Sequence, residues 1–185
     1  MENLPDNFAG KPIRFRIPYE QQGELVVANN TTGVPFADST FLHTVDKPFE
    51  IHRMIVSITP FDNTVGTPLV VTPSNLSQNA PAGPTATLDI RRILQSFVRL
   101  RIRDVSKNEN LFKNAQLVET MLSRNEGSWA FRCPYTLVRA EGLEITVDNV
   151  APATFVIGTQ TCANLRIEIG FQGYLIVVAV PSETR

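Results

Sequence analysis

The amino-acid sequence predicts an all-β fold, an antiparallel β-sandwich of about 8–10 short strands with one short helix near residues 88–96. Three observations carry this prediction. Apolar and polar residues alternate with a period of two in several segments, turn-forming residues separate these segments, and one segment has the helical period instead. Alternation of this kind leaves one face of a sheet in contact with water, which antiparallel sheets permit and parallel sheets generally do not.

The strands with the clearest alternation cover residues 13–17, 98–103, 143–148 and 165–172. In the second of these, apolar residues occupy one face and three arginines the other. Segment 49–60 changes face near His52 and Arg53, which predicts a β-bulge at that point. Further strands are expected at residues 24–28, 39–46, 68–72, 129–133 and 173–180.

The connections between these strands are rich in Asn, Gly, Pro and Ser, residues that favour turns. They include NNTTG, PFDNTVGTP, PSNLSQNAPAGP, SRNEG and DNVAPA. The exception is TLDIRRILQSF, where Ile90, Ile93, Leu94 and Phe97 have the i, i+3, i+4, i+7 spacing of a helix, with Thr87 as a possible N-cap. The segment AQLVETMLSR fits either a helix or a strand, and residues 72–84 are expected to form a long exposed loop.

The length of 185 residues fits one domain. We expect a flexible N-terminal arm at residues 1–12, a single β-sandwich domain at residues 13–180 and a short tail at residues 181–185. A chain of 20.5 kDa can build a hydrophobic core without disulfides. Cys133 and Cys162 are therefore predicted to be buried free thiols.

Charge and hydropathy exclude several classes of partner. The formal net charge of −1 gives no overall attraction for nucleic acid or anionic lipid, so neither is expected as a partner. The longest apolar run has seven residues, Tyr174–Val180, whereas a membrane-spanning helix needs about 20. The first residues lack the apolar core of a signal peptide, which predicts that the chain is made in the host cytoplasm.

Residues for catalysis or metal binding are scarce. His43, His52 and the two cysteines do not have the spacing of a zinc site, and structural histidines are the favoured interpretation. The sequence contains no nucleophile elbow, phosphate-binding loop or dinucleotide fingerprint. The carboxylate pairs Glu141 with Glu144 and Glu168 with Asp148 are better explained as solvated surface charge than as a glycosidase pair. We therefore expect no enzyme activity, no catalytic or metal-binding residue and no cofactor.

The arrangement of arginines is the feature of the sequence that most directly suggests a binding surface. We predict a protein interface at Arg14, Arg16, Arg99, Arg101 and Arg103. Three arginines on one face of one strand repel each other unless something compensates their charge. Cross-strand pairing with residues such as Glu144, Asp148 and Glu168 is one interpretation. Contact with an acidic protein surface or, less favoured, with phosphates is the other.

Several motifs in the C-terminal half resemble accessory virion proteins of tailed bacteriophages, the capsid decoration, cement or minor capsid proteins. They are a strand that ends in Asp104, a turn with Leu111 and Phe112, a Pro-initiated strand pair split by a Glu-Gly turn at 134–149, and a last hairpin with Phe171, Gly173 and Tyr174. This resemblance implies a jelly-roll-like sandwich on the outside of a capsid shell that clamps neighbouring subunits of the major capsid protein. It further implies a homodimer or homotrimer, and it carries no catalytic residues.

The predicted function is thus that of a structural protein that binds and stabilises an assembled shell at coat-subunit junctions, with the arm and the tail as segments that wrap neighbours. The longer N-terminal half and the arginine-rich strand leave a place at the portal or tail open. A carbohydrate- or receptor-binding module of a phage particle is the main alternative, and it predicts an exposed aromatic platform around Trp129, Tyr135 or Tyr174. A small polysaccharide-degrading enzyme is a further one.

Overall fold

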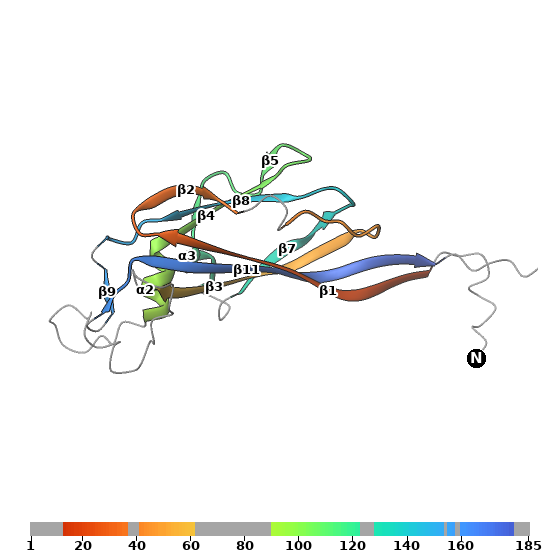
Figure 1. Ribbon diagram of the computed structural model, residues 1–185. Helices are drawn as coiled ribbons and strands as arrows, with labels where there is room; N and C mark the ends of the chain where they lie inside the picture. Colours follow the sequence, from red (N-terminus) through yellow and green to blue (C-terminus); the bar gives the residue numbers. More distant parts are fainter. Residues whose placement is uncertain are drawn as a thin grey trace, which may run out of the picture.

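The computed structural model describes residues 13–36, 41–61, 90–122, 128–153, 155–157 and 160–179. These residues form two antiparallel β-sheets that face each other, with two short helices at one end (Figure 1). The prediction of an all-β antiparallel sandwich is confirmed. The described part of the chain has eleven strands, of which four contain only two residues.

The first sheet has the order β1-β11-β3-β7 and is built from β1 (Ile13–Ala28), β11 (Asn164–Ala179), β3 (Phe49–Phe61) and β7 (Ser128–Leu137). The second sheet has the order β2-β8-β4-β5 and is built from β2 (Thr31–Pro35), β8 (Leu143–Asn149), β4 (Val98–Asp104) and β5 (Glu109–Asn110). β6 (Gln116–Leu117) also pairs with β4, and β9 (Val156–Ile157) pairs with β10 (Gln160–Thr161). The helices are α2 (Ile90–Phe97) and α3 (Val118–Leu122).

The first four strands of the chain alternate between the two sheets, and β7 and β8 do so again. β1 lies in the first sheet and β2 in the second, β3 returns to the first and β4 to the second, and the last strand, β11, lies between β1 and β3. Strands that cross between two antiparallel sheets in this order form the jelly-roll arrangement. The first and last strands are therefore direct neighbours although they are far apart in the sequence.

The core lies between the sheets and is formed by every second residue of the central strands. The seven residues of β4 alternate strictly between buried and exposed, and β8 buries every second residue in the same way. Phe41, Phe49 and Phe171 are among the largest fully buried side chains. One face of each strand is thus closed against the opposite sheet, which is the physical origin of the alternation in the sequence.

Hydrogen bonds of one buried side chain join the two sheets at the turn between β1 and β2. The buried Asn149 side chain at the end of β8 donates hydrogen bonds to the carbonyl oxygens of Val27 and Ala28, at 3.1 and 3.2 Å. Its Oδ1 atom accepts a bond from the Ala151 N–H at 3.1 Å. Because the Asn149 side chain is removed from water, these bonds offset its desolvation cost and fix the turn against the second sheet.

β1 and β11 are the longest strands and pair over their whole length, from Ile13 with Ala179 to Ala28 with Asn164. β3 accompanies β11 only as far as the pair of Leu175 with Phe49. Beyond this point β1 and β11 continue as a two-stranded ribbon that projects past the rest of the sandwich (Figure 1). We call this part the ribbon; it consists of residues 13–17 and 175–179.

The bulge predicted near His52 is present. The register of β3 shifts against β7 between Ile51 and Arg53, and the register of β11 shifts against β3 between Gln172 and Gly173. The shift lets Phe49 and Ile51 on one side, and Met54 on the other, all point into the core.

The predicted α-helix is confirmed at Ile90–Phe97, and the ambiguous segment 115–124 contains the two-residue strand β6 followed by α3. The strands predicted at 13–17 and 24–28 are one continuous strand, β1, because the polar and glycine residues between them stay extended. The strands predicted at 165–172 and 173–180 likewise form one strand, β11. The Phe-x-Gly-Tyr motif therefore lies inside β11 and not in a hairpin.

Three predictions are wrong. Residues 41–46 form only an isolated bridge between Leu42 and Gly142 instead of a strand. The segment NNTTG is not all turn, since β2 begins at Thr31 directly after a left-handed Asn30. Cys133 is exposed on the edge strand β7, and only Cys162 is buried.

The predicted arm 1–12, the strand 68–72, most of the loop 72–84 and the tail 181–185 lie outside the described residues. Within the described residues, no helix has the length and hydropathy to cross a membrane.

Candidate functional site

The five predicted interface arginines lie in two groups on two different sheets. Arg99, Arg101 and Arg103 are on β4 in the second sheet, whereas Arg14 and Arg16 are on β1 in the first sheet, within the ribbon. The structure therefore brings each group together but does not merge them into one surface.

The β4 arginines project from the outer face of the second sheet. Their neighbours in β4 are fully buried, so the alternation of the strand places all three guanidinium groups on the side that faces solvent. The residues directly opposite them on β8 are Asp148, Thr146 and Glu144.

Only one of these arginines has an acidic partner within the described chain. Arg103 lies 3.3 Å from Glu144 and also donates a hydrogen bond to Asn108. Asp148, opposite Arg99, accepts a hydrogen bond from the Gly33 N–H at 2.8 Å and forms no ion pair among the residues described. Cross-strand compensation therefore covers one arginine of three.

A shallow groove runs beside these side chains, between β4 and the segment that carries β5 and β6. Arg99, Arg101, Asn110 and Lys113 line it, and Arg101 also borders a second hollow next to Arg103. Lys113, like Arg99 and Arg101, forms no ion pair with the described residues. We call Arg99, Arg101, Arg103 and Lys113 the arginine face.

The other two arginines lie on the ribbon. Arg16 forms an ion pair with Glu50 at 3.2 Å and lies over the ring of Tyr174. Arg14 has no ion-pair partner among the described residues, and it is opposite Val178 on β11.

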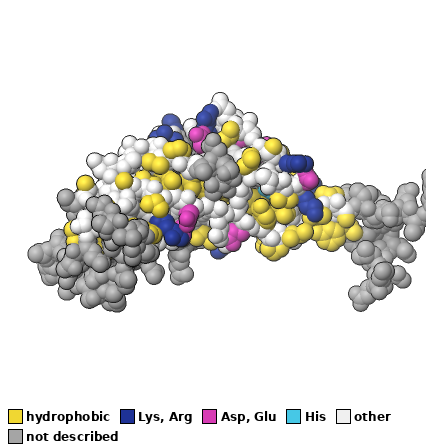
Figure 2. All heavy atoms as spheres, in the orientation of Figure 1, with side chains coloured by type: hydrophobic (Ala, Val, Ile, Leu, Met, Phe, Trp, Pro, Cys, Tyr) yellow, Lys and Arg dark blue, Asp and Glu magenta, His cyan; other side chains and the backbone are white. Residues whose placement is uncertain are grey.

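Exposed apolar side chains lie on both faces of the ribbon, and one of these faces also carries Arg14 and Arg16. Phe15 and Ile17 on one face are 50% and 45% exposed, and Val178 on the other face is 53% exposed. Figure 2 shows hydrophobic side chains gathered at this end of the molecule, beside Lys and Arg side chains. A two-stranded ribbon has no second layer of its own, so these side chains stay in contact with water unless another surface covers them.

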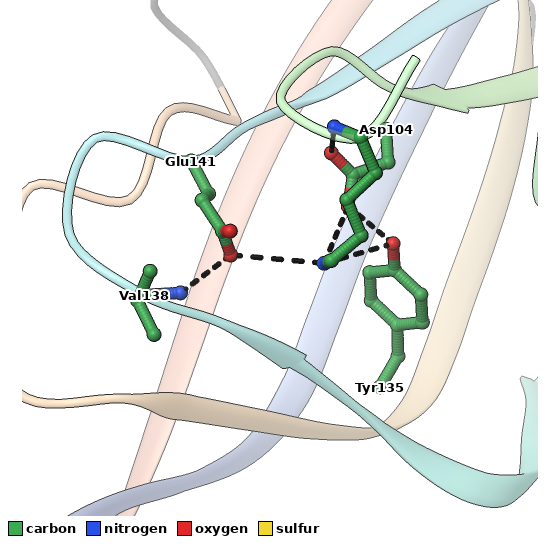
Figure 3. A network of polar contacts seen from close by, with 5 residues as sticks. Asp104, Tyr135, Val138 and Glu141 are labelled. Carbon is green, nitrogen blue, oxygen red and sulfur yellow. Dashed lines mark hydrogen bonds and ion pairs between the residues drawn. The ribbon is translucent and has the colours of Figure 1, made fainter. Parts of the chain in front are cut away.

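A buried polar cluster ties the two sheets together at the far end of β4 (Figure 3). Asp104 is fully buried and accepts hydrogen bonds from Lys107 Nζ at 2.8 Å, from the Lys107 N–H at 3.0 Å and from the Tyr135 hydroxyl. Lys107 Nζ also lies 3.8 Å from Glu141 and 4.9 Å from the centre of the Tyr135 ring. Since Asp104 belongs to the second sheet and Tyr135 to β7 in the first, the cluster is a clamp between layers.

The hydrogen bonds of this clamp shift the pKa values of its members. Burial alone raises the pKa of Asp104, but the bonds from Lys107 and Tyr135 outweigh it and hold the pKa below the ordinary 3.8. The bond to Asp104 raises the pKa of Lys107 above its ordinary value. Burial, followed by the bond to Asp104, raises the pKa of Tyr135 to about 12. All three groups therefore keep one protonation state near neutral pH, which suits a structural clamp better than proton transfer.

In the predicted pair of Glu141 and Glu144, the two carboxylates face different cations, Lys107 at 3.8 Å and Arg103 at 3.3 Å. The other predicted pair is divided between the two sheets. Glu168 is on β11 in the first sheet, whereas Asp148 is on β8 in the second. The acidic side chains that do face each other are Glu24 and Glu168, and Arg166 bridges them at 3.2 and 2.5 Å. Among the described residues, no group of three or more His, Cys, Asp or Glu side chains is placed to hold a metal ion.

Both histidines have structural surroundings. The ring of the buried His43 forms a hydrogen bond to the Lys47 carbonyl at 2.7 Å and lies beside the rings of Tyr19 and Phe49. His52 contacts the edge of the Tyr174 ring at the bulge. Burial raises the pKa of the Cys162 thiol, which makes it a poor nucleophile.

The aromatic residues of the alternative function do not form a flat platform. Trp129 packs edge to face against Phe112 and Phe131, with ring centres 5.0 and 4.4 Å apart. Trp129, Tyr135 and Tyr174 are each half-buried. Arg16 lies over the ring of Tyr174 and Lys107 over the ring of Tyr135, so these rings are already in contact with other side chains.

Two features of the surface were missed in the sequence. Lys113 joins the arginine face through a turn, and no periodic pattern links it to β4. The charge order along β1, in which two arginines precede two glutamates on the same face, was visible in IRFRIPYEQQGE, but Pro18 and Gly23 divided the segment.

We compared the chain with protein-family models, curated proteins and solved structures, and none of them matches it, so the inference of function rests on the geometry above.

Proposed function

We propose that the chain is a non-enzymatic structural protein of a bacteriophage particle, which binds the assembled capsid shell at junctions between subunits of the major capsid protein and stabilises it. The observation that carries this proposal is the arginine face. Arg99 and Arg101 are exposed on the same face of β4, line one groove, and have no ion-pair partner among the residues described. Each guanidinium keeps its full capacity for paired hydrogen bonds to a carboxylate of another molecule.

The balance of charge supports a protein partner. The net charge of the whole chain is −1, so attraction at the arginine face is local and does not extend to polyanions in general. Aromatic side chains, on which single-stranded nucleic acid stacks, do not line the groove beside Arg101. A shell repeats one acidic junction many times, so an oligomer of this chain binds by avidity although each contact is weak.

The test is co-sedimentation with empty shells of a tailed bacteriophage that encodes the chain. Arg101→Glu is expected to weaken shell binding about tenfold or more, because the new carboxylate repels the acidic surface that Arg101 attracts. The melting temperature is expected to stay the same or rise, since a glutamate between Arg99 and Arg103 relieves their repulsion.

Arg132→Glu is the matched control. Arg132 is exposed on β7 in the other sheet and has no ion pair with the described residues, so this variant has the same charge change at a distant site. The proposal is contradicted if Arg101→Glu co-sediments as well as wild type, or if both variants lose binding equally.

A further inference from the structure

We propose that the arginine face binds an extended acidic segment of its partner protein, with three consecutive carboxylate side chains at the centre of the contact. The inference rests on the proposed function, because it concerns the same face, and it adds the form of the partner and the spacing of its charges. The binding site is the groove between β4 and the connection from β5 to β6, residues 111–115.

This groove is cationic. Arg99, Arg101 and Lys113 line it, and none of the three has an ion-pair partner in the described chain. No acidic side chain is present among the described residues that line it. Its volume of about 690 Å³ is of the size that holds a ligand of many atoms instead of a single ion. Three uncompensated cations around one groove favour an anionic occupant of matching charge.

The groove opens where the strand that pairs with β4 changes. β5 pairs with β4 at Arg103 and β6 pairs with it at Arg99, so Arg101 has no paired residue on this side among those described. On its other side, β4 pairs with β8 along its whole length. Because both edges of β4 are occupied, a bound segment does not add to it as a new strand. It lies over the sheet and makes its contacts through side chains.

The spacing of the arginines matches the repeat of an extended chain. Arg99 and Arg101 are two positions apart on one strand, so their side chains leave the sheet about 6.7 Å apart. Alternate side chains of an extended peptide have the same spacing and point to the same side. Carboxylates at positions i and i+2 of the segment therefore meet Arg99 and Arg101. The side chain at i+1 points to the other wall of the groove, where Lys113 lies.

The acidic run is expected to end at Arg103. The guanidinium of Arg103 lies 3.3 Å from Glu144 and donates a hydrogen bond to Asn108, so a further carboxylate would compete with partners already in place. The side-chain amides of Asn110 and Asn114 line the groove and form no hydrogen bond with the described residues. They can therefore bond to the backbone of the bound segment.

The experiment measures the fluorescence anisotropy of labelled peptides with blocked ends, at low ionic strength and without shells. The first peptide has three consecutive glutamates between uncharged serine and glycine residues. The second has the same composition, but its glutamates are at positions i, i+3 and i+6, so an extended chain cannot bring them to Arg99, Arg101 and Lys113 together. We expect the first peptide to bind at least about tenfold more tightly than the second.

A double-mutant cycle tests the position of the middle charge. Replacement of the middle glutamate with glutamine should weaken binding to wild type about threefold or more. The same replacement should change binding to Lys113→Gln little, because the cation that this glutamate faces is gone. Arg132→Gln, in the other sheet, is the matched control and should bind both peptides as wild type does. Circular dichroism checks that each variant is folded.

Equal binding of the two peptides, or no saturable binding of the first, would overturn the proposal. So would an equal effect of the middle glutamine on wild type and on Lys113→Gln. A thymidine oligonucleotide with three phosphates that binds as tightly as the first peptide would also overturn it, since the groove would then select charge alone.

These outcomes are distinct from those of the shell experiment. If Arg101→Glu loses shell binding while the first peptide binds no better than the second, the face recognises a folded acidic surface; the proposed function then stands and the present inference fails. If the first peptide binds as expected but wild type does not sediment with shells, the proposed function fails and the assignment of the groove stands.

Discussion

Replacement of Lys107 with Met is expected to lower the free energy of unfolding by about 3 kcal/mol at pH 7. The change removes the cation that faces the buried carboxylate of Asp104 and leaves that charge with only the Tyr135 hydroxyl and one backbone N–H. Loss of one partner from a buried ion pair costs about 3–5 kcal/mol. We expect the lower end because Lys107 itself is 42% exposed and water solvates part of its charge.

The loss is expected to depend on pH. In the wild-type chain the folded pKa of Asp104 is below 3.8, so its contribution is fully present above about pH 4 and is lost as the pH falls through the folded pKa. Without Lys107 the buried carboxyl has a raised pKa instead, and its protonated form needs no counter-charge. The difference between Lys107→Met and wild type should therefore be smaller at pH 4 than at pH 7.

Urea unfolding at both pH values measures these differences. Lys113→Met is the control, because Lys113 is exposed and has no ion pair with the described residues; its effect should stay within about 0.5 kcal/mol. Adding Asp104→Asn to Lys107→Met should recover part of the loss at pH 7. An equal loss at both pH values, or no recovery in the double variant, would show that the clamp does not act through charge.

Replacement of Gly173 with Ala is expected to destabilise the fold by about 3 kcal/mol or more. A Cβ atom at this position would lie 1.8 Å from the carbonyl oxygen of Glu50 and 2.8 Å from its carbonyl carbon. These are backbone atoms of the neighbouring strand, so no rotamer change relieves the clash. β11 and β3 would have to separate at the bulge, next to the fully buried Phe49 and Ile51.

Gly170→Ala is the matched control in the same strand. Its Cβ would lie 3.3 Å from the side-chain Oε1 atom of Glu20, which can move away. We expect a change below about 1 kcal/mol, of either sign, because alanine also reduces the entropy of the unfolded chain. The midpoint of thermal or urea unfolding distinguishes the two variants, and similar values for both would contradict the close approach at Gly173.

Period-two alternation predicted β4 and β8 well because each has one face against the core and one in water. The same alternation wrongly predicted a strand at residues 39–46. There Phe41 and His43 are buried although the segment around them forms only an isolated bridge at Leu42. Alternation shows which face of a strand is buried, but it does not show which strand is its neighbour. The pairing of β1 with β11 and of β3 with β7 was therefore not predictable from the sequence.

The candidate site divides in the same way. The row of arginines on β4 follows from local sequence. Whether each arginine finds an acidic partner depends on the register of β4 against β8 and on which other groups bond to the acidic residues of β8. Asp148 faces Arg99 and yet bonds to Gly33, a contact across 115 positions of the chain. The link from Asp104 to Lys107 is local, whereas Tyr135 joins them only because the two sheets stack.

The direct pairing of β1 with β11 has a consequence for how the chain reaches its native state. β11 separates β1 from β3 in the first sheet, so β1 has no partner in this sheet until the last strand is made, whereas β3 can already pair with β7. During translation β1 therefore waits for β11, and their pairing closes a loop of more than a hundred residues, which slows folding. Topologies dominated by such distant contacts fold in about milliseconds to seconds, and the waiting strands are vulnerable to aggregation.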